Sequence, residues 1–297
     1  MIQLDFMKKN KIERDAIVDK FCKELYLSCQ KTKRQYLDDW CTNNLCLPTF
    51  FDTSKKDFHP FLEIMKADFS ILIEIKEHLN LVSPTMQAQM KDYLTTTVYE
   101  KINHKAFTSI LGVSVCPYCN RNYINSTHSS TTCQFDHFFC KDDFPIFSAS
   151  FYNLIPVCPS CNLKKSVHKF SYSPYDISVT PDQMYSFSYL PTHSDYLTNR
   201  QHIKILINES PFSKIHDNLN ILKLQELYQL HSDIVQELII KKQIYSPTYN
   251  SYLKKELNIS ENELNRLITS AYTNNEDYGK RPLSKLITDI SKEIGLI

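Results

Sequence analysis

The chain has 297 residues, of which 42% are hydrophobic and 23% are charged, and its formal net charge is +1. This length and composition are those of a globular protein with a sizeable core, which argues against extensive disorder and leaves the number of domains open. Only three glycines occur, Gly112, Gly279 and Gly295, so a glycine-rich phosphate loop of the Walker A or Rossmann type is excluded.

The charge and the cysteines narrow the class of protein further. A net charge of +1 gives no overall attraction to nucleic acid, so binding to a polyanion would depend on local patches such as Lys164-Lys165. No stretch approaches 18 apolar residues, and we expect neither secretion nor insertion into a membrane. Ten cysteines, four of them in two CxxC pairs, fit a reducing cytoplasm and bound zinc better than a disulfide scaffold.

The amino-terminal region, residues 1–111, is predicted to be helical. An amphipathic helix is expected over residues 11–30, with Cys22 and Cys29 on its buried face and these apolar positions at near-helical spacing: Ile12, Ile17, Phe21, Leu25 and Leu27. A second helix is expected to start at Ser83-Pro84, because Ser is a good cap and Pro suits the first turn. Its apolar stripe is Met86, Met90, Tyr93, Leu94 and Val98. The helical region ends near Gly112.

The composition changes in the middle region, residues 112–178, where Cys, Asn, Ser, Phe and Pro replace the helical pattern. Residues 121–124 and 132–135 are predicted to be two short strands joined by a polar turn at 125–130. A helix beginning near Ser160 would complete a strand-strand-helix unit.

The carboxy-terminal region, residues 179–297, begins with two predicted strands, 185–190 and 202–207, and is helical afterwards. One helical stripe is expected from Ile221 to Leu238, with His231 on a helix face or in the core. Ser260-Glu-Asn-Glu263 has the pattern of a capping box. The predicted fold class is therefore α+β and mostly helical.

Four cysteines form two knuckles, Cys116-Pro-Tyr-Cys119 and Cys158-Pro-Ser-Cys161. At CxxC spacing, two sulfurs from one tight turn reach the same ion, so two knuckles complete the tetrahedral shell of a structural zinc. Such a site does no chemistry and contributes folding free energy. Two other interpretations stay open: the cysteines are buried small hydrophobic residues, or they are a redox dithiol, which leaves the second pair unexplained.

Five polar residues lie between the knuckles or directly after them: Asp136, His137, Asn153, Asn162 and Lys165. Hydrolysis of a phosphodiester needs a general base for water and a cation for the developing charge. His137 is the candidate base, and the oxygens of Asp136 and Asn162 suit Mg²⁺ or Mn²⁺. Asn153 is expected to orient His137 or to brace its loop, and Lys165 to meet a substrate phosphate. Each residue alone has an ordinary structural explanation, and the prediction depends on their order.

That order resembles the HNH nuclease motif in its zinc-bearing form with Asn at the third position. The resemblance runs through Cys116-Pro-Tyr-Cys119-Asn-Arg-Asn-Tyr123, Phe135-Asp-His-Phe138, Asp143-Phe-Pro145 and Asn153-Leu-Ile-Pro-Val-Cys158. It is similar to HNH nucleases of bacterial anti-phage systems, particularly the Septu-type component that works beside an ATPase. The similarity covers about residues 112–178, less than a quarter of the chain. One departure is Cys140-Lys141, where many relatives have Pro-Lys, so the role of Lys141 is open.

The resemblance implies a ββα-metal core, stapled by the four-cysteine zinc site and flanked by the helical regions 1–111 and 179–297. It assigns the general base to His137, the catalytic metal ligands to Asp136 and Asn162, and the orienting role to Asn153. The implied activity is metal-dependent hydrolysis of nucleic acid, DNA rather than RNA, in anti-phage defence with an ATPase partner. Two alternatives stay open: a non-catalytic zinc module that binds nucleic acid or scaffolds a complex, and an HNH nuclease directed at RNA.

Overall fold

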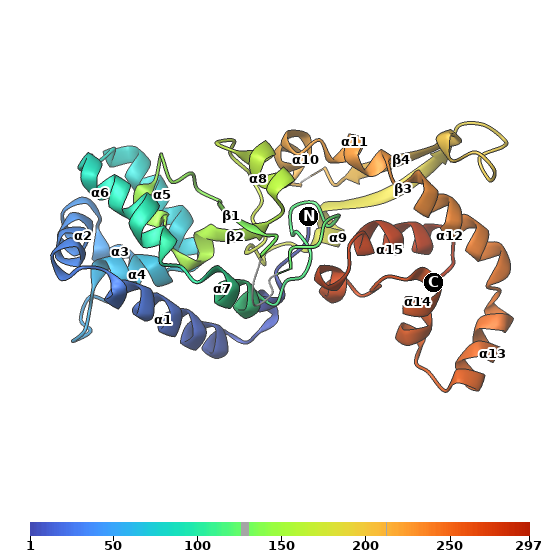
Figure 1. The fold of residues 1–297 in the computed structure, drawn as a ribbon, viewed down its shortest axis with the longest axis horizontal. Coiled ribbons are helices and arrows are strands. Elements are labelled where there is room, and N and C mark those ends of the chain that lie inside the picture. Colours follow the sequence, from blue (N-terminus) through green and yellow to red (C-terminus); the bar gives the residue numbers. More distant parts are fainter. Residues whose placement is uncertain (126–130, 212) are drawn as a thin grey trace. The chain divides into compact units, whose positions relative to one another are not determined.

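The computed structural model describes residues 1–125, 131–211 and 213–297, and the chain forms two compact units (Figure 1). The cysteine unit comprises Met1–Asp5, Val113–Asn125 and Val157–Ile297, and the helical unit comprises Phe6–Gly112 and Ser126–Pro156. Residues of the predicted core segment 112–178 therefore belong to both units. The division into three consecutive regions stays a prediction.

Helices and one small sheet make up the helical unit. The sheet pairs β1 (Gln134–His137) with β2 (Leu154–Val157). The helical elements are η1 (Asp5–Lys8), α1 (Lys11–Ser28), α2 (Lys31–Asn44), α3 (Leu47–Phe50), α4 (Pro60–Lys66), α5 (Phe69–Val82), α6 (Ala88–Asp92), the π-helical segment η2 (Tyr93–Val98), α7 (His104–Leu111), η3 (Pro145–Phe147) and η4 (Phe151–Asn153).

Helix α1 confirms the first predicted helix. Its cap is Asn10, whose side chain accepts a hydrogen bond from the Glu13 backbone N–H, which satisfies one of the orphan donors of the first turn. Cys22 and Cys29 are both buried, as expected. The predicted apolar face is wrong at its edges, because Ile12 and Leu27 are exposed.

The predicted start of a second helix at Ser83 is wrong. Ser83 adopts a left-handed conformation, with φ of 43°, and its N–H donates to the Leu79 carbonyl, so it ends α5. The next helix, α6, begins only at Ala88. Ser-Pro is a common beginning of a helix, but here the apolar run of α5 continues up to Val82 and Ser83 closes that run. The helical stretch does end at Gly112, with φ of 64°.

Aromatic side chains form the core of the helical unit. The Phe107 ring lies 4.9 Å from the Phe151 ring and 5.2 Å from the Phe135 ring. A second group joins Phe139 to Phe147 at 5.7 Å and to Phe69 at 5.9 Å. Because these rings come from α5, α7, β1, η3 and η4, the small sheet is held by packing against helices distant from it in sequence.

The predicted pairing of the first two strands is wrong. Residues 121–124 contribute a single bridge, Val115 with Tyr123, and the second predicted strand is shifted to β1, Gln134–His137. β1 pairs with β2 instead. Of the predicted turn, residues 126–130 lie outside the described residues. In chain order β1, β2 and then α8 (Pro159–Lys165) give strand, strand and helix, with the helix at the predicted place.

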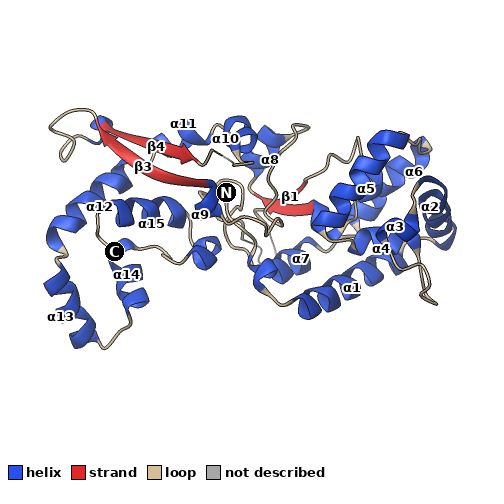
Figure 2. Cartoon of the chain, turned by 180° about the vertical axis from the view of Figure 1, so that it is seen from behind, coloured by secondary structure: helices blue, strands red, loops and turns tan. Residues whose placement is uncertain are grey.

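The cysteine unit contains the second sheet, in which β3 (Tyr185–Pro191) and β4 (Ile203–Glu209) pair antiparallel, from Tyr185 opposite Glu209 to Pro191 opposite Ile203 (Figure 2). Both strands confirm the sequence prediction. The other elements are α8, α9 (Pro181–Met184), η5 (Arg200–His202), α10 (His216–Ile221), α11 (Leu224–Gln229), α12 (Ser232–Ile244), α13 (Pro247–Leu257), α14 (Glu261–Thr269), η6 (Asn275–Lys280) and α15 (Ser284–Glu293). The chief neighbour of β3 among the helices is α15, while α11 and α12 contact β4.

The predicted stripe from Ile221 to Leu238 is divided among three helices. Lys223 has a φ of 55°, and this left-handed residue separates α10 from α11 as the cap of α11. His231 is the cap residue of α12 and separates it from α11. Leu224 and Leu238 are buried in the expected way. The capping box of α14 is confirmed: the Ser260 side chain accepts from the Glu263 N–H, and the Glu263 carboxylate accepts from the Ser260 N–H.

In the part of the chain that is described, every helix is too short or too polar to cross a membrane.

Candidate functional site

The four knuckle cysteines form one buried cluster in the cysteine unit. The sulfurs of Cys116, Cys119, Cys158 and Cys161 all lie within 4.8 Å of one another. Among the described residues this is the one group of three or more His, Cys, Asp and Glu side chains that could hold a metal ion. The two predicted knuckles are therefore brought together by the fold.

The first knuckle is a tight backbone turn. The Asn120 N–H donates to the Cys116 carbonyl at 2.8 Å, and the Cys116 N–H donates to the Asn122 carbonyl at 2.9 Å. Asn120 has a φ of 50°, a left-handed conformation that Asn tolerates better than most residues. This reversal brings the chain back so that Cys116 and Cys119 face the same point.

The second knuckle is the beginning of α8. Cys158 is the cap residue, Pro159 occupies the first turn, and the N–H groups of Cys161 and Asn162 both donate to the Cys158 carbonyl. Pro suits this position because its fixed φ matches a helix and its missing N–H has no partner there anyway. A helical first turn thus directs Cys158 and Cys161 to the same side.

The electrostatics of the cluster suit a cation. The Asn122 amide donates to the Cys158 sulfur at 3.3 Å, and the Arg121 N–H donates to the Cys119 sulfur at 3.4 Å. Hydrogen bonds with Cys116 and the other cluster thiols hold the pKa of Cys158 far below its usual range and raise that of Cys161. Four adjacent sulfurs cannot all ionise without a positive charge between them. A metal such as zinc supplies that charge and takes four thiolates tetrahedrally, so the residues fit the ion.

Elements distant in sequence fasten the first knuckle, a support that the motif does not reveal. The Tyr228 hydroxyl donates to the Cys119 carbonyl at 2.6 Å. The Asn120 amide donates to the Tyr278 carbonyl at 2.8 Å, and its oxygen accepts from the Lys285 N–H at 3.2 Å. These bonds connect the knuckle to α11, η6 and α15. The cluster is thus part of the framework of the cysteine unit.

Asp136 and His137 lie at the end of β1, in the helical unit. The His137 imidazole is half-buried, its Nε2 lies 3.1 Å from the Ser148 carbonyl oxygen, and its ring centroid is 5.1 Å from that of Tyr99. A carbonyl only accepts, so Nε2 carries the proton and the lone pair of the neutral imidazole is on Nδ1. The contact of Nε2 with the Ser148 carbonyl and the neighbouring Tyr99 ring both orient this imidazole.

Asn153 braces the loop that follows β1. Its side-chain oxygen accepts from the Phe139 N–H at 2.7 Å, and its amide donates to the carbonyls of Phe139 at 3.2 Å and Phe147 at 3.1 Å. Its backbone carbonyl also accepts from the Phe138 N–H at 2.9 Å. Of the two roles expected for Asn153, these contacts match the loop brace. The side chain is fully buried, and no local pattern in the sequence indicates its partners.

Asp136 is nearly enclosed, with 4% of its surface exposed. Sequence reasoning missed its aromatic neighbour Tyr99, which follows the π-helical segment η2. Burial, then the charges of Cys133 and Asp136, raise the pKa of Tyr99 to about 12. The Tyr99 ring also lies 5.7 Å from Lys141 Nζ, which donates to the Thr95 carbonyl at 3.4 Å. A π-helix often marks a functional position.

Asn162 and Lys165 lie on α8, in the cysteine unit. Asn162 is half-buried, and Lys165 is 1% exposed with its Nζ 5.7 Å from the Phe170 ring. Asp136, His137 and Asn153 belong to the other unit. The predicted catalytic residues are thus divided between the two units, and the pairing of Asp136 with Asn162 on one ion stays a prediction.

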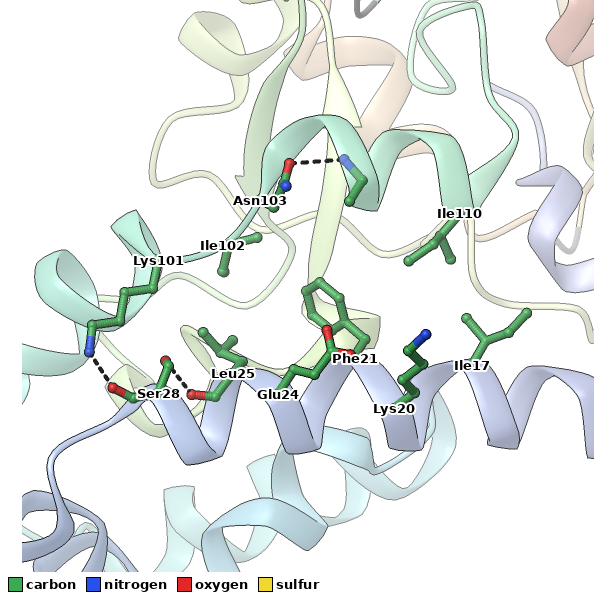
Figure 3. A pocket seen from close by; sticks show the side chains of 11 residues that line it. Ile17, Lys20, Phe21, Glu24, Leu25, Ser28, Lys101, Ile102, Asn103 and Ile110 are labelled. Atoms are coloured by element: carbon green, nitrogen blue, oxygen red, sulfur yellow. Dashed lines mark hydrogen bonds between the residues drawn. The ribbon is translucent and has the colours of Figure 1, made fainter. Parts of the chain in front are cut away.

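A groove of about 490 Å³ lies between α1 on one side and α7 with the segment before it on the other (Figure 3). Ile17, Phe21 and Leu25 line it on the α1 side, and Ile102 and Ile110 on the other. Lys101 crosses one end and donates to the Ser28 carbonyl at 2.6 Å. The groove is mainly apolar and contains none of the predicted catalytic residues.

No family model, curated protein or solved structure matches the chain in comparisons with known proteins.

Proposed function

We propose that the chain is a metal-dependent endonuclease of the HNH type, which hydrolyses phosphodiester bonds of nucleic acid and favours DNA. The observation that carries this proposal is the geometry of His137. The Nε2 of His137 lies within hydrogen-bonding distance of the Ser148 carbonyl, so in the neutral imidazole the lone pair is on Nδ1, and the ring is half-buried. In the proposal, Nδ1 is the atom that takes a proton from water.

In this proposal the chain uses two kinds of metal site. The cluster of Cys116, Cys119, Cys158 and Cys161 holds a structural zinc, for which its burial and sulfur distances are suited. The order of the motif assigns Asp136 and Asn162 to a catalytic Mg²⁺ or Mn²⁺, which when bound neutralises charge on the scissile phosphate. A phosphate contact by Lys165 requires that the substrate reach a side chain that is 1% exposed.

The biological setting of the proposal is cytoplasmic anti-phage defence beside an ATPase partner. This part rests on the resemblance of the cysteine, Asp-His and Asn pattern to the HNH components of such systems. The other proposed partner is nucleic acid, and DNA is favoured over RNA as the substrate. Co-purification of the chain with the product of a neighbouring ATPase gene tests the partner directly.

The deciding experiment is cleavage of labelled DNA and RNA by the purified chain, with and without Mg²⁺ or Mn²⁺, and with and without that ATPase. Replacing the positioned base in His137→Ala is expected to lower the rate about 10²- to 10⁴-fold while nucleic-acid binding persists. His193→Ala is the matched control, since His193 is exposed on the turn after β3. Full activity of a folded His137→Ala protein rejects the assignment.

A second candidate function is a non-catalytic zinc module that binds nucleic acid or scaffolds a complex. The hydrogen bonds from Tyr228 and Lys285 to the first knuckle favour it, because they give the cluster a structural role without any catalysis. Zinc-loaded protein that binds nucleic acid, yet cleaves neither DNA nor RNA under any of these conditions, would support this module over the nuclease.

A further inference from the structure

Helix α13 (Pro247–Leu257) has no buried residue, although three of its large side chains are apolar or aromatic and exposed. Tyr249 is 42% exposed, Tyr252 is 57% exposed and Leu257 is 54% exposed. The main neighbour of α13 is α14, and in Figures 1 and 2 it lies at the edge of the cysteine unit. Burial in a core therefore does not explain its aromatic face.

Local signals in the sequence form this helix. The Ser246 side chain accepts from the Tyr249 N–H at 3.2 Å, Pro247 occupies the first turn, and Asn258 closes the end with a φ of 50°. Lys254 forms an ion pair with Glu261 of α14. A helix of this length is marginal by itself, so caps and the ion pair are what hold it. The chain thus forms a helix whose exposed face is available for another molecule.

Three tyrosines lie close together at this helix, and we call them the tyrosine ladder: Tyr245, which ends α12, and Tyr249 and Tyr252 of α13. The spacing of three residues places Tyr249 and Tyr252 on one face of α13, and Tyr245 precedes the helix. The ring centroids of Tyr245 and Tyr249 are 5.9 Å apart at 31°, and those of Tyr249 and Tyr252 are 6.4 Å apart at 14°. The rings of Tyr249 and Tyr252 are therefore nearly parallel, while the Tyr245 ring is tilted against that of Tyr249.

Positive charge accompanies the ladder on both sides in the sequence. Lysines occupy the last turns of α12 and α13: Lys241, Lys242, Lys254 and Lys255. Glu256 is the only acidic residue in the stretch 238–258, which gives this stretch a net charge of +3 in a chain of +1. The ion pair of Lys254 with Glu261 offsets part of that charge, and Lys242 donates to the Gly295 carbonyl.

We infer that the tyrosine ladder is a binding surface for single-stranded nucleic acid, on which unpaired bases stack against the rings while the lysines meet the phosphates. Aromatic rings beside a basic backbone track are the general means by which proteins hold single strands without reading sequence. Exposed apolar area alone would favour a protein partner. The nearly parallel rings of Tyr249 and Tyr252 and the local charge of +3 favour instead a polyanion with flat bases. The inference goes beyond the proposed nuclease activity, and it does not depend on His137.

Fluorescence anisotropy with the full chain tests the ladder. The chain carries His137→Ala and no Mg²⁺ or Mn²⁺ is added, so that cleavage does not interfere; the probes are labelled oligothymidylate, labelled oligouridylate and a DNA duplex. Tyr249→Ala and Tyr252→Ala are each expected to weaken oligothymidylate binding about fivefold or more. Tyr252→Phe should bind like the parent, and Lys255→Ala should reduce the salt dependence of the Kd by about one phosphate contact.

Two controls distinguish stacking from simple apolar contact. Tyr252→Leu keeps apolar area but removes the ring, so it should bind as weakly as Tyr252→Ala. Leu267→Ala removes an exposed apolar side chain of α14 and should leave the affinity for oligothymidylate unchanged. Unchanged affinity in the Tyr249→Ala, Tyr252→Ala double variant overturns the inference, as does equal binding of single strand and duplex. Full affinity of Tyr252→Leu would overturn stacking and point to an apolar protein interface.

Discussion

The cysteine cluster and the His137 site are built on different physical principles. The cluster gathers four sulfurs within 4.8 Å, and ionisation of all four would require a cation between them. The orientation of His137 depends instead on neutral contacts with the Ser148 carbonyl and the Tyr99 ring, and on the loop that Asn153 braces. We therefore expect the cysteine cluster to lose its structure as a whole when the metal is removed. The orientation of His137 should instead weaken gradually as its individual contacts are removed.

The largest effect is expected at the cluster. Cys158→Ser should remove about one tightly bound zinc per chain and unfold the cysteine unit, because metal binding and folding are coupled in such sites. Metal analysis and thermal unfolding measure both. Cys46→Ser is the matched control, since Cys46 is exposed and outside the cluster. Zinc-free wild-type protein, or an unchanged Tm in Cys158→Ser, would show that the cysteines are ordinary core residues.

Asn153→Ala should have the next largest effect, since the side chain is fully buried and makes three hydrogen bonds. Its loss leaves backbone groups of Phe139 and Phe147 without this partner, at a cost of about 3 kcal/mol in the free energy of unfolding. Chemical denaturation measures the change. Asn208→Ala, at an exposed position of β4, should cost less than about 0.5 kcal/mol. Equal losses in the free energy of unfolding in Asn153→Ala and Asn208→Ala would show that Asn153 does not brace the loop.

Tyr99 is expected to position His137 through its ring. Tyr99→Ala should slow cleavage roughly 10- to 100-fold by loosening the imidazole, whereas Tyr99→Phe keeps the ring and the rate. The ¹⁵N signals of the His137 ring should shift in Tyr99→Ala and stay in Tyr99→Phe. A lower Tm with unchanged ring signals would mean that Tyr99 only packs. The NMR readout needs no nuclease activity, so it remains informative if the proposed function fails.

The smallest effect concerns pH in the helical unit. Burial lowers the pKa of His104 below its ordinary value of 6.5. Below pH 6.5 the unfolded chain binds a proton at this residue that the folded chain does not yet bind, so stability is retained above pH 6.5 and falls as the pH falls. His104→Gln should reduce that slope, which thermal unfolding at several pH values measures. An identical slope in His104→Gln assigns the acid sensitivity to other groups.

Several features followed from the sequence because their causes are local. The CxxC spacing predicted which four cysteines meet, since a tight turn delivers two sulfurs wherever it occurs. The sequence also predicted the strands at 185–190 and 202–207, which are β3 and β4, and the Ser260–Glu263 pattern predicted the cap of α14. In each case residues within one turn or one strand determine the geometry.

Only the tertiary structure decided the remainder, because the partners lie far apart in the chain. Ser83 ends a helix instead of beginning one, since α5 is buried as far as Leu79 and the Leu79 carbonyl accepts the Ser83 N–H. β1 pairs with β2 rather than with residues 121–124, since aromatic packing against α7 and η4 selects the pairing. The bonds of Asn153 and the ring contact of Tyr99 with His137 likewise join segments that no local pattern connects. The sequence by itself determined the residues of the cluster and the identity of the candidate base, while the contacts that orient that base arise from long-range packing.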